Sequence, residues 1–462
     1  MSATVRPAPG LDWQGEAVTI GDVLNALNGI RKKFAAAALG DEEQPHPRSC
    51  VMTLVGVTAT ESDERRAQRA SRAIAIHHPS LAIVIRDQPD MPMGRIEAAI
   101  TTGTHQPASA GAVQFELVTL RVRGAAGEHL AALVDPMLLS GIPTYLWWLG
   151  TPPFGARELE DALRICDALV VDSSRFDAPY HSFLGLSRLA ASSHRGLGVA
   201  DFQWARLTPW RESIAQFFGP ADRRAFLSGL SGLGIDYAGE GRGNRVAAAL
   251  LIGWFASALG WKLQRAAGGA GGVVVAHFAT GAGRRLEVAF RSVTKAHLAP
   301  GEVSAVRIGG SSGGRTFQLS VQRDPDRPRR MAPDAGPAGF RSLHPAGGED
   351  DAGLEIAQRN AARHRGVLDE NRQALHHTAT GEPPGESLPA RPTVLVRERR
   401  RQDTAQVLLT LIDIGGTKTL RHVQRVEPED DAALLLGLLS AGAHDRVQAR
   451  SLSAAAELMR AL

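Results

Sequence analysis

The chain has 462 residues, with 52 Lys and Arg against 48 Asp and Glu, which gives a formal net charge of +4. At about 150 residues per domain, this length predicts two or three domains. The 44% of hydrophobic and 22% of charged residues are typical of a globular protein with a sizeable core. So small a net charge on so long a chain argues against a nucleic-acid partner, because nucleic-acid-binding proteins gather basic residues on one face.

Two cysteines, Cys50 and Cys166, exclude a disulfide scaffold and a metal site built from four cysteines. The amino-terminal stretch lacks the basic and apolar regions of a secretion signal. The best candidate stretch for a membrane helix, the 16 uncharged residues at 246–261, is shorter than the roughly 20 residues that cross a bilayer. We therefore expect no membrane partner and a cytoplasmic location.

The first part of the chain alternates strands with helices. Apolar residues at Ile20, Val23, Leu27 and Ile30 follow helical spacing and predict an amphipathic helix at 19–39. Strands are predicted at 50–58, 81–86, 113–122, 144–149 and 168–171, and helices at 61–76, 128–139, 156–166 and 176–190. This alternation predicts an N-terminal arm with the amphipathic helix at 1–48, and then an α/β domain at 49–200. The domain should hold a mainly parallel sheet with helices on both faces.

After residue 200 the pattern changes to helices followed by successive strands. Helices are predicted at 208–218 and 246–259, and strands at 273–278, 286–290, 303–308 and 317–321. Glycine-rich turns between the strands predict an α+β domain with an antiparallel sheet at 201–322. Residues 323–391 have the composition of a low-order insertion or linker. Strands at 393–397 and 407–414 and two final helices are expected to complete the second domain within 392–462.

Motifs that could carry chemistry are weak. The string DIGGTK at 413–418 resembles the phosphate loop of sugar kinases, but only 44 residues follow it, so we interpret it as a tight turn after a strand. The GxSxG matches within GGSSGG at 309–314 join two predicted strands, and a hairpin turn explains them. GEGRGN at 239–244 lacks the third glycine of a dinucleotide loop. We assign no catalytic, cofactor-binding or metal-binding residue and expect no cofactor.

One polar cluster follows a predicted parallel strand, at the strand end where α/β sheets place their ligands. Asp172, Ser173, Ser174 and Arg175 form a candidate anion pocket, because hydroxyls and a guanidinium bind phosphate groups. The alternative is that Asp172 or Ser173 caps the next helix while Arg175 pairs on the surface.

Tryptophan is concentrated in one stretch, since four of the seven tryptophans fall between positions 147 and 210. Most are expected in the core. Trp and Arg are also common anchors of protein interfaces. The candidates for contact with a partner are Trp148, Trp204, Arg206, Trp210 and Arg211.

Four strings, in this order and spacing, resemble the OpcA family of glucose-6-phosphate dehydrogenase assembly proteins. They are VDPMLLSGIPTYLWWLGTPPF at 134–154, DALVVDSSRF at 167–176, WARLTPWRESIAQFF at 204–218 and LLIGWFASALGW at 250–261. The resemblance covers roughly residues 20–322 and the closing segment from about 393.

The resemblance implies a non-catalytic protein. Members of this family are understood to bind glucose-6-phosphate dehydrogenase, promote its active oligomer and raise its response to substrate, which supports the oxidative pentose phosphate pathway. No catalytic residues and no cysteine role are carried over. A second hypothesis, from another class, is a sugar-phosphate-binding enzyme or sensor that uses Asp172–Arg175.

Overall fold

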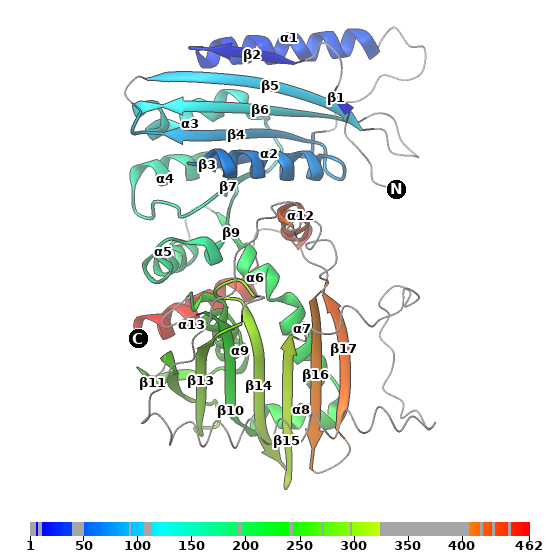
Figure 1. Cartoon of the computed structure of the whole chain (residues 1–462), viewed down its shortest axis with the longest axis vertical. Helices are drawn as coiled ribbons and strands as arrows, with labels where there is room; N and C mark the ends of the chain where they lie inside the picture. The colour runs from blue at the N-terminus through cyan, green and yellow to red at the C-terminus, as the bar shows by residue number, and fades with distance from the viewer. Residues whose placement is uncertain are drawn as a thin grey trace, which may run out of the picture. The chain divides into compact units, whose positions relative to one another are not determined.

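The computed structural model describes residues 6–7, 12–38, 50–91, 94–105, 113–192, 196–239, 244–269, 272–295, 298–323, 406–415, 419–426, 430–441 and 445–462. The chain divides into two compact units. All described elements belong to the unit formed by 1–326 and 405–462 (Figure 1). Several predicted segments lie outside the described residues. They are the insertion beyond Arg323, the strand at 393–397, and the N-terminal arm except for 6–7 and 12–38.

The first sheet has nine strands in the order β1-β5-β6-β4-β3-β7-β8-β9, with β2 also paired to β5. Its strands are β1 (Arg6–Pro7), β2 (Trp13–Glu16), β3 (Met52–Thr58), β4 (Ser80–Gln88), β5 (Arg95–His105), β6 (Val113–Arg123), β7 (Thr144–Trp148), β8 (Ala168–Val171) and β9 (Gly198–Asp201). Every pair from β6 to β9 is parallel, whereas β5 pairs antiparallel with β6. The predicted parallel sheet is confirmed, and β5, where the sequence predicted a loop, adds an antiparallel edge.

Helices cover both faces of this sheet. They are α1 (Ile20–Ala38), α2 (Glu61–Ala75), α3 (Leu130–Val134), α4 (Arg157–Ala162) and α5 (Pro179–Ala191), with 3-10 turns η1 (Gly124–His129), η2 (Asp135–Met137), η3 (Leu163–Ile165) and η4 (Ser173–Arg175). Even-numbered residues of β3 and β4, such as Leu54 and Val84, pack with Ile74 of α2. Odd-numbered residues such as Ile83 pack with Leu27 of α1 and Phe183 of α5. Strand alternation thus builds two cores, one on each face.

The helix predicted at 128–139 is broken into η1, α3 and η2. Pro136 lies at the start of η2. Proline lacks a backbone N–H and collides with the preceding turn, so a continuous helix cannot run through this position.

The second sheet has eight strands in the order β11-β12-β13-β10-β14-β15-β16-β17. They are β10 (Leu230–Ala238), β11 (Lys262–Gly268), β12 (Val274–Ala279), β13 (Arg285–Val293), β14 (Val303–Ser312), β15 (Arg315–Arg323), β16 (Gln406–Ile414) and β17 (Leu420–Val426). All neighbours are antiparallel except β10 and β13. The predicted antiparallel sheet is therefore largely confirmed.

Two sequence motifs lie in turns of this sheet. Ser312 pairs with Arg315 across a two-residue turn, in which Gly313 and Gly314 have positive φ angles of 58° and 76°. This left-handed backbone suits glycine and closes a tight hairpin, as predicted for GGSSGG. The second motif, DIGGTK at 413–418, begins in β16 with Asp413 and Ile414. The strand ends there, and Gly415 begins a turn.

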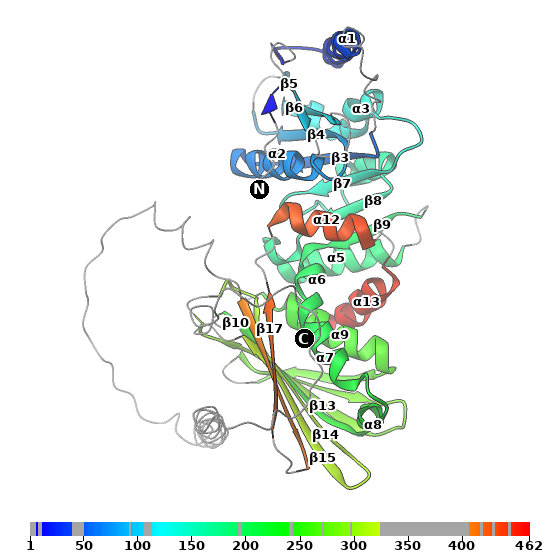
Figure 2. The same ribbon diagram turned by 90° about the vertical axis from the view of Figure 1, so that its right-hand side faces the viewer.

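The remaining helices connect the two sheets or follow them. They are α6 (Phe202–Arg206), α7 (Thr208–Phe218), α8 (Ala221–Arg224), α9 (Val246–Leu259), α12 (Asp431–Ala441) and α13 (Arg446–Arg460), with the turn η5 (Ala225–Gly229). In Figure 2, α7, α8, α9 and α13 lie on one side of the second sheet. The closing segment serves both sheets: β16 and β17 extend the second, whereas α12 packs on α2 of the first. None of the described helices is long and apolar enough to span a membrane.

Helices α9 and α13 approach each other closely at Gly253. A Cβ atom there would lie 2.2 Å from the carbonyl oxygen of Ser451 and 2.8 Å from the backbone nitrogen of Ala455. Only glycine fits this crossing without displacing α13.

We expect Gly253→Ala to lower the free energy of unfolding by about 1–3 kcal/mol, because the methyl group overpacks the crossing. Gly437→Ala is the matched control, since Gly437 is also helical and a Cβ there meets nothing within 4 Å. That control should raise stability by about 0.5–1 kcal/mol through helix propensity alone. Urea unfolding of both variants checks the opposite signs, and equal effects would contradict the close crossing.

Candidate functional site

The middle of the first sheet has the topology of a nucleotide site. The strand order β6-β4-β3-β7-β8-β9 is the doubly wound order of dinucleotide-binding domains, with the reversal between β3 and β7. In such sheets, ligands bind at the carboxyl ends of the strands beside this reversal. The turn from β3 to α2 would hold the pyrophosphate.

That turn is acidic here and contains no glycine between residues 57 and 63. Thr60 caps α2 by accepting a hydrogen bond from the backbone nitrogen of Asp63 at 3.1 Å. The first turn of the helix carries Glu61, Asp63 and Glu64. A helix N-terminus attracts anions, but three carboxylates already occupy that role and would repel a phosphate.

Glu64 is 1% exposed and fastens α2 to two strands. Its carboxylate accepts hydrogen bonds from Arg121 of β6, the shortest at 2.9 Å, and pairs with Arg86 of β4 at 3.1 Å. A charge so deeply buried is stable only when it is paired. This part of the nucleotide crevice is filled by the protein's own ion pairs.

The end of β8 holds a second network, which we call the Asp172 cluster: Arg66, Asp172, Ser174, Arg206 and Asp431. Asp172 caps η4 and binds both terminal nitrogens of Arg206, at 2.7 and 2.9 Å. The hydroxyl of Ser174 donates to Asp172 at 2.6 Å, and Arg66 lies 3.7 Å from the same carboxylate. Burial alone raises the pKa of Asp172, but the hydrogen bonds and charge of Arg206 outweigh it and hold the pKa below its usual value.

Ser173 turns away from this cluster and binds Asp201 at the end of the neighbouring strand β9. Its hydroxyl donates to Asp201 at 2.5 Å, and its backbone nitrogen donates at 3.0 Å. Both residues have no exposed surface. Burial raises the pKa of Asp201 to about 6, against the opposing hydrogen bonds from Ser173. No substrate reaches this serine in the described arrangement.

The two networks also hold the C-terminal helices. Arg66 binds Asp431, the first residue of α12. Asp445 caps α13 and accepts a hydrogen bond from the indole nitrogen of Trp204 at 2.9 Å. The side-chain amide of Asn244, just before α9, donates to the carbonyl of Ser174 at 3.0 Å. Three helices, α9, α12 and α13, are thereby anchored near the ends of β8 and β9.

The four residues of the predicted anion pocket are close together, but three of them have internal partners. Asp172, Ser173 and Ser174 make the bonds described above, and only Arg175 is exposed, at 52% of its side chain. Arg175 lies 3.7 Å from Asp172 and 3.8 Å from Asp63. Asp172 caps the turn η4 and not the following helix α5, whose N-cap Ala178 makes no side-chain hydrogen bond. The internal partners of these residues do not favour the sugar-phosphate hypothesis.

The predicted interface tryptophans are mostly internal. Trp204 and Trp210 are 3% and 2% exposed, and Trp148 is half-buried against the same core. Arg211 stacks on Trp204 with its guanidinium carbon 3.4 Å from the ring centroid, and burial lowers its pKa to about 10. Arg206 belongs to the Asp172 cluster. In this conformation these side chains stabilise the joint between the sheets, and their contact with a partner stays a prediction.

The thiol of Cys166 has different surroundings from those of a reactive cysteine. Cys50 and Cys166 are both half-buried. Burial and the neighbouring Asp167 raise the pKa of Cys166 to about 12, so the thiolate is scarce at neutral pH. Within the described residues, no group of three or more His, Cys, Asp or Glu side chains is placed to hold a metal ion.

Sequence reasoning missed Arg66, Asp201, Asp431 and Asp445. Each forms a hydrogen bond with a residue at least 28 positions away in the chain. The pattern of neighbouring residues gives no indication of such distant pairs. Asp201 alone carried a signal, because it ends a short strand, much as Asp172 directly follows β8.

The fold and site therefore define a doubly wound α/β domain whose nucleotide crevice is filled by ion pairs, joined to a mainly antiparallel sheet. Residues 71–188 match the glucose-6-phosphate dehydrogenase subunit N-terminal domain, and residues 197–451 match the C-terminal domain of the same family. The chain belongs to this family, OpcA.

Known relatives match a shorter part of the chain. The putative OxPP cycle protein OpcA of Synechocystis sp. is 33% identical over 146 residues, which are 32% of this chain and 30% of that protein. The protein of the same description from Synechococcus elongatus is 36% identical over 147 residues, 32% of each chain. The matched stretch thus spans about a third of these relatives.

Among solved structures, the chain is similar to the UDP-N-acetylglucosamine 3-dehydrogenase GnnA from Acidithiobacillus ferrooxidans. The two share 11% identity with a TM-score of 0.37, over 89% of this chain and 97% of that one. A likeness this weak supports no statement about activity.

We expect Arg206→Ala to lower the free energy of unfolding by about 3–5 kcal/mol, because it leaves the carboxylate of Asp172 buried without its main partner. Arg65→Ala is the matched control, since Arg65 and its partner Glu61 are both about 60% exposed, and it should cost less than about 1 kcal/mol. Urea unfolding at neutral pH measures both. A loss for Arg206→Ala as small as that of the control would contradict a structural role for the cluster.

Asp201 predicts a pH dependence of stability. Its pKa in the folded protein is about 6, above the unfolded value of about 3.9. Between these values the folded state binds more protons, so this group makes stability fall as the pH rises from about 4 to about 6. Above pH 6 its contribution is constant.

Unfolding of the wild type and Asp201→Asn at several pH values isolates this contribution from those of other carboxylates. The difference in stability, wild type minus variant, should decrease over that interval and then level off. A difference that does not change with pH would show that Asp201 titrates normally.

Proposed function

We propose that this chain is a non-catalytic assembly factor and allosteric activator of glucose-6-phosphate dehydrogenase, which supports the oxidative pentose phosphate pathway and its production of NADPH. Membership of a family described as a subunit of that enzyme is the observation that carries the proposal. The names of the OpcA relatives as OxPP cycle proteins agree with it.

The geometry of the first sheet supports a binding role over a catalytic one. An enzyme of this topology would bind its nucleotide at the carboxyl ends of β3 and β7. Here Glu61, Asp63 and the pairs of Glu64 stand at that position. The fold of a nucleotide-binding domain is retained while its phosphate site is occupied by side chains, which leaves the outer surfaces for contact with a partner.

Such a protein activates by binding the active form of its partner more tightly than the inactive form. The activation cannot exceed the difference between the two binding free energies. Couplings of this kind change an affinity by about 5- to 150-fold. Because this coupling is reciprocal, bound substrate strengthens the complex between this chain and the dehydrogenase by the same factor.

The test is to titrate the chain into the cognate dehydrogenase and to measure KM for glucose 6-phosphate, kcat and the mass of the complex. We expect a complex, a larger share of the active oligomer and a lower KM or higher kcat. The chain alone, mixed with glucose 6-phosphate and NADP⁺, is the control and should show no turnover. Unchanged kinetics together with no complex would refute the proposal, and turnover by the chain alone would refute its non-catalytic part.

A further inference from the structure

Helix α2 has three sides with different surroundings. Its buried residues pack on the first sheet, and Arg66 on a second side binds Asp431 of α12. The third side carries Arg65, Arg69 and Arg72, whose spacing of four and three residues places them on one face of the helix. We call this side the arginine stripe.

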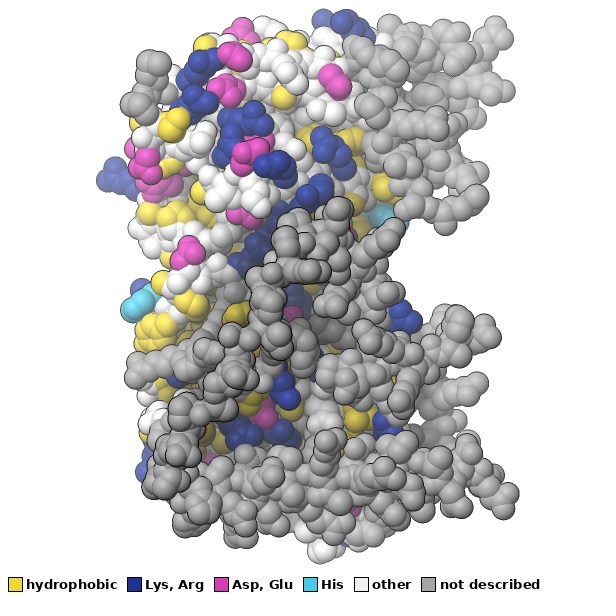
Figure 3. Space-filling view, in the orientation of Figure 1, with side chains coloured by type: hydrophobic (Ala, Val, Ile, Leu, Met, Phe, Trp, Pro, Cys, Tyr) yellow, Lys and Arg dark blue, Asp and Glu magenta, His cyan; other side chains and the backbone are white. Residues whose placement is uncertain are grey.

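The arginine stripe is open to solvent. The side chain of Arg65 is 63% exposed, Arg69 is exposed and Arg72 is partly exposed. Figure 3 shows dark blue Lys and Arg side chains gathered over α2 and the strands beside it. A second molecule can therefore reach these guanidinium groups without any movement of the chain.

Two of the three arginines have no partner of opposite charge. Arg65 pairs with Glu61 at 2.8 Å, but a pair as exposed as this one is screened by water and contributes little. Arg69 and Arg72 form no hydrogen bond or ion pair within the part of the chain that the structure describes. The sequence has no Asp or Glu at 65–86, so the positive charge is not balanced along the helix.

The strands beside the stripe have balanced charge instead. Arg123 of β6 pairs with Glu97 of β5 at 2.8 Å, and Arg95 of β5 pairs with Glu16 of β2. An ordinary solvated surface mixes both signs of charge, as these strands do. The stripe departs from this pattern, because most of its length carries one sign only.

The stability of α2 explains only one of the arginines. Arg72 lies in the last turn, where the helix dipole favours a cation. Arg69 lies nearer the middle of the helix, where that effect has faded. Ala, Gln or Glu would serve the helix about as well as arginine at this position. The repeated arginine therefore indicates a contact outside the chain.

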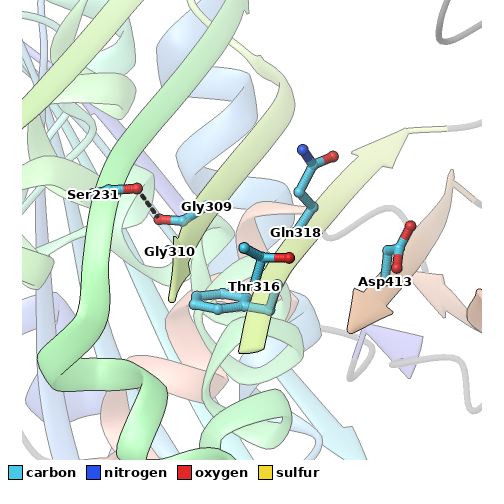
Figure 4. Close-up of a pocket in the computed structure, with 7 residues that line it drawn as sticks. Ser231, Gly309, Gly310, Thr316, Gln318 and Asp413 are labelled. Carbon is cyan, nitrogen blue, oxygen red and sulfur yellow. Dashed lines mark hydrogen bonds between the residues drawn. The ribbon is translucent and has the colours of Figure 1, made fainter. Parts of the chain in front are cut away.

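A cavity on the second sheet has the opposite character. It has a volume of about 360 Å³, and its described lining includes Ser231, Thr316, Gln318 and Asp413 but no Lys or Arg (Figure 4). An acidic ligand would meet the carboxylate of Asp413 there and be repelled. Of these two places, the stripe alone has charge that is complementary to an acidic partner.

We propose that the arginine stripe is a docking surface for an acidic segment of a partner protein. Arg65 and Arg72 are seven residues apart, which is about 10 Å along a helix. A partner helix with carboxylates at the same spacing matches this length, and each guanidinium can bind a carboxylate through two hydrogen bonds. This docking surface rests on the proposed function, since the partner is the dehydrogenase.

The stripe is too short for a nucleic acid. Binding to DNA draws on many phosphate contacts, often about 6–10, whereas the stripe offers three cations. Glu61 and Asp63 in the first turn of α2 would also repel a phosphate chain that runs along the helix. A folded protein can place its carboxylates beside the arginines alone, and such complementary charges steer its association.

The test reverses the charge of the two arginines that lack partners. In Arg69→Glu/Arg72→Glu, two attractive contacts become repulsive, so Kd for the cognate dehydrogenase should rise about tenfold or more, mainly through slower association. Arg69→Gln/Arg72→Gln only removes the charge and should cause a smaller rise. Biolayer interferometry at low and high salt measures both rates, and the difference between wild type and variants should shrink at high salt.

The matched control is Arg446→Glu/Arg450→Glu. These two arginines are exposed on α13 and form no hydrogen bond or ion pair with other described residues. Their reversal changes the net charge of the chain by the same amount, yet the Kd should stay near that of the wild type. Circular dichroism and urea unfolding should show that every variant is folded.

The possible results distinguish the docking surface from the proposed function. A wild-type complex that Arg69→Glu/Arg72→Glu leaves unchanged, or that the control weakens equally, would overturn the docking surface and leave the proposed function standing. Absence of a wild-type complex would refute the proposed function and the docking surface with it. A DNA duplex that binds the wild type but not Arg69→Glu/Arg72→Glu would show a nucleic-acid site and also overturn the docking surface.

Discussion

The ion pair between Asp172 and Arg206 is the interaction on which the joint between the two sheets depends. Asp172 directly follows β8 of the first sheet, and Arg206 ends α6, the helix that leads toward the second. A carboxylate that is 3% exposed is stable only with a cation beside it. The position of α6 is therefore fixed by electrostatics as well as by apolar packing, and the hydrogen bonds of Asn244 and Arg66 add α9 and α12 to the same point.

The first sheet shows how a nucleotide-binding topology can serve another purpose. Strand order and the βα turns follow from apolar alternation and right-handed connections, and neither requires a ligand. The phosphate site itself depends on a few glycines and an unoccupied helix N-terminus. Here Thr60 and the acidic first turn of α2 take those positions. The scaffold keeps its stability because Glu64 is paired with Arg86 and Arg121, so a change at one turn alters the role without altering the fold.

Much of the architecture could be predicted from sequence, because the strongest signals are local. The bounds of α7 and α9 agree with the prediction residue for residue, since each has clear apolar spacing and a Pro or Gly near an end. Strand β10 was not predicted, because Gly232 and Gly234 interrupt the alternation of apolar and polar side chains along it. The candidate site was predicted in part: Asp172 to Arg175 do lie at a strand end, but their partners Arg206, Arg66 and Asp201 come from other elements. Pairing between segments far apart in the chain leaves no local pattern.

The place of α12 has a consequence for synthesis of the protein. Ala432, Leu434 and Leu435 complete the apolar layer that includes Ile74 and Trp147 of the first sheet. The parallel part of that sheet begins with β3, yet its covering helix is synthesised only after every described strand of both sheets. Until then α2 has an uncovered apolar side, so the amino-terminal half cannot reach its final stability during translation. A chain cut short before α12 would expose that layer and be a target for chaperones and proteases, even with every strand of the first sheet intact.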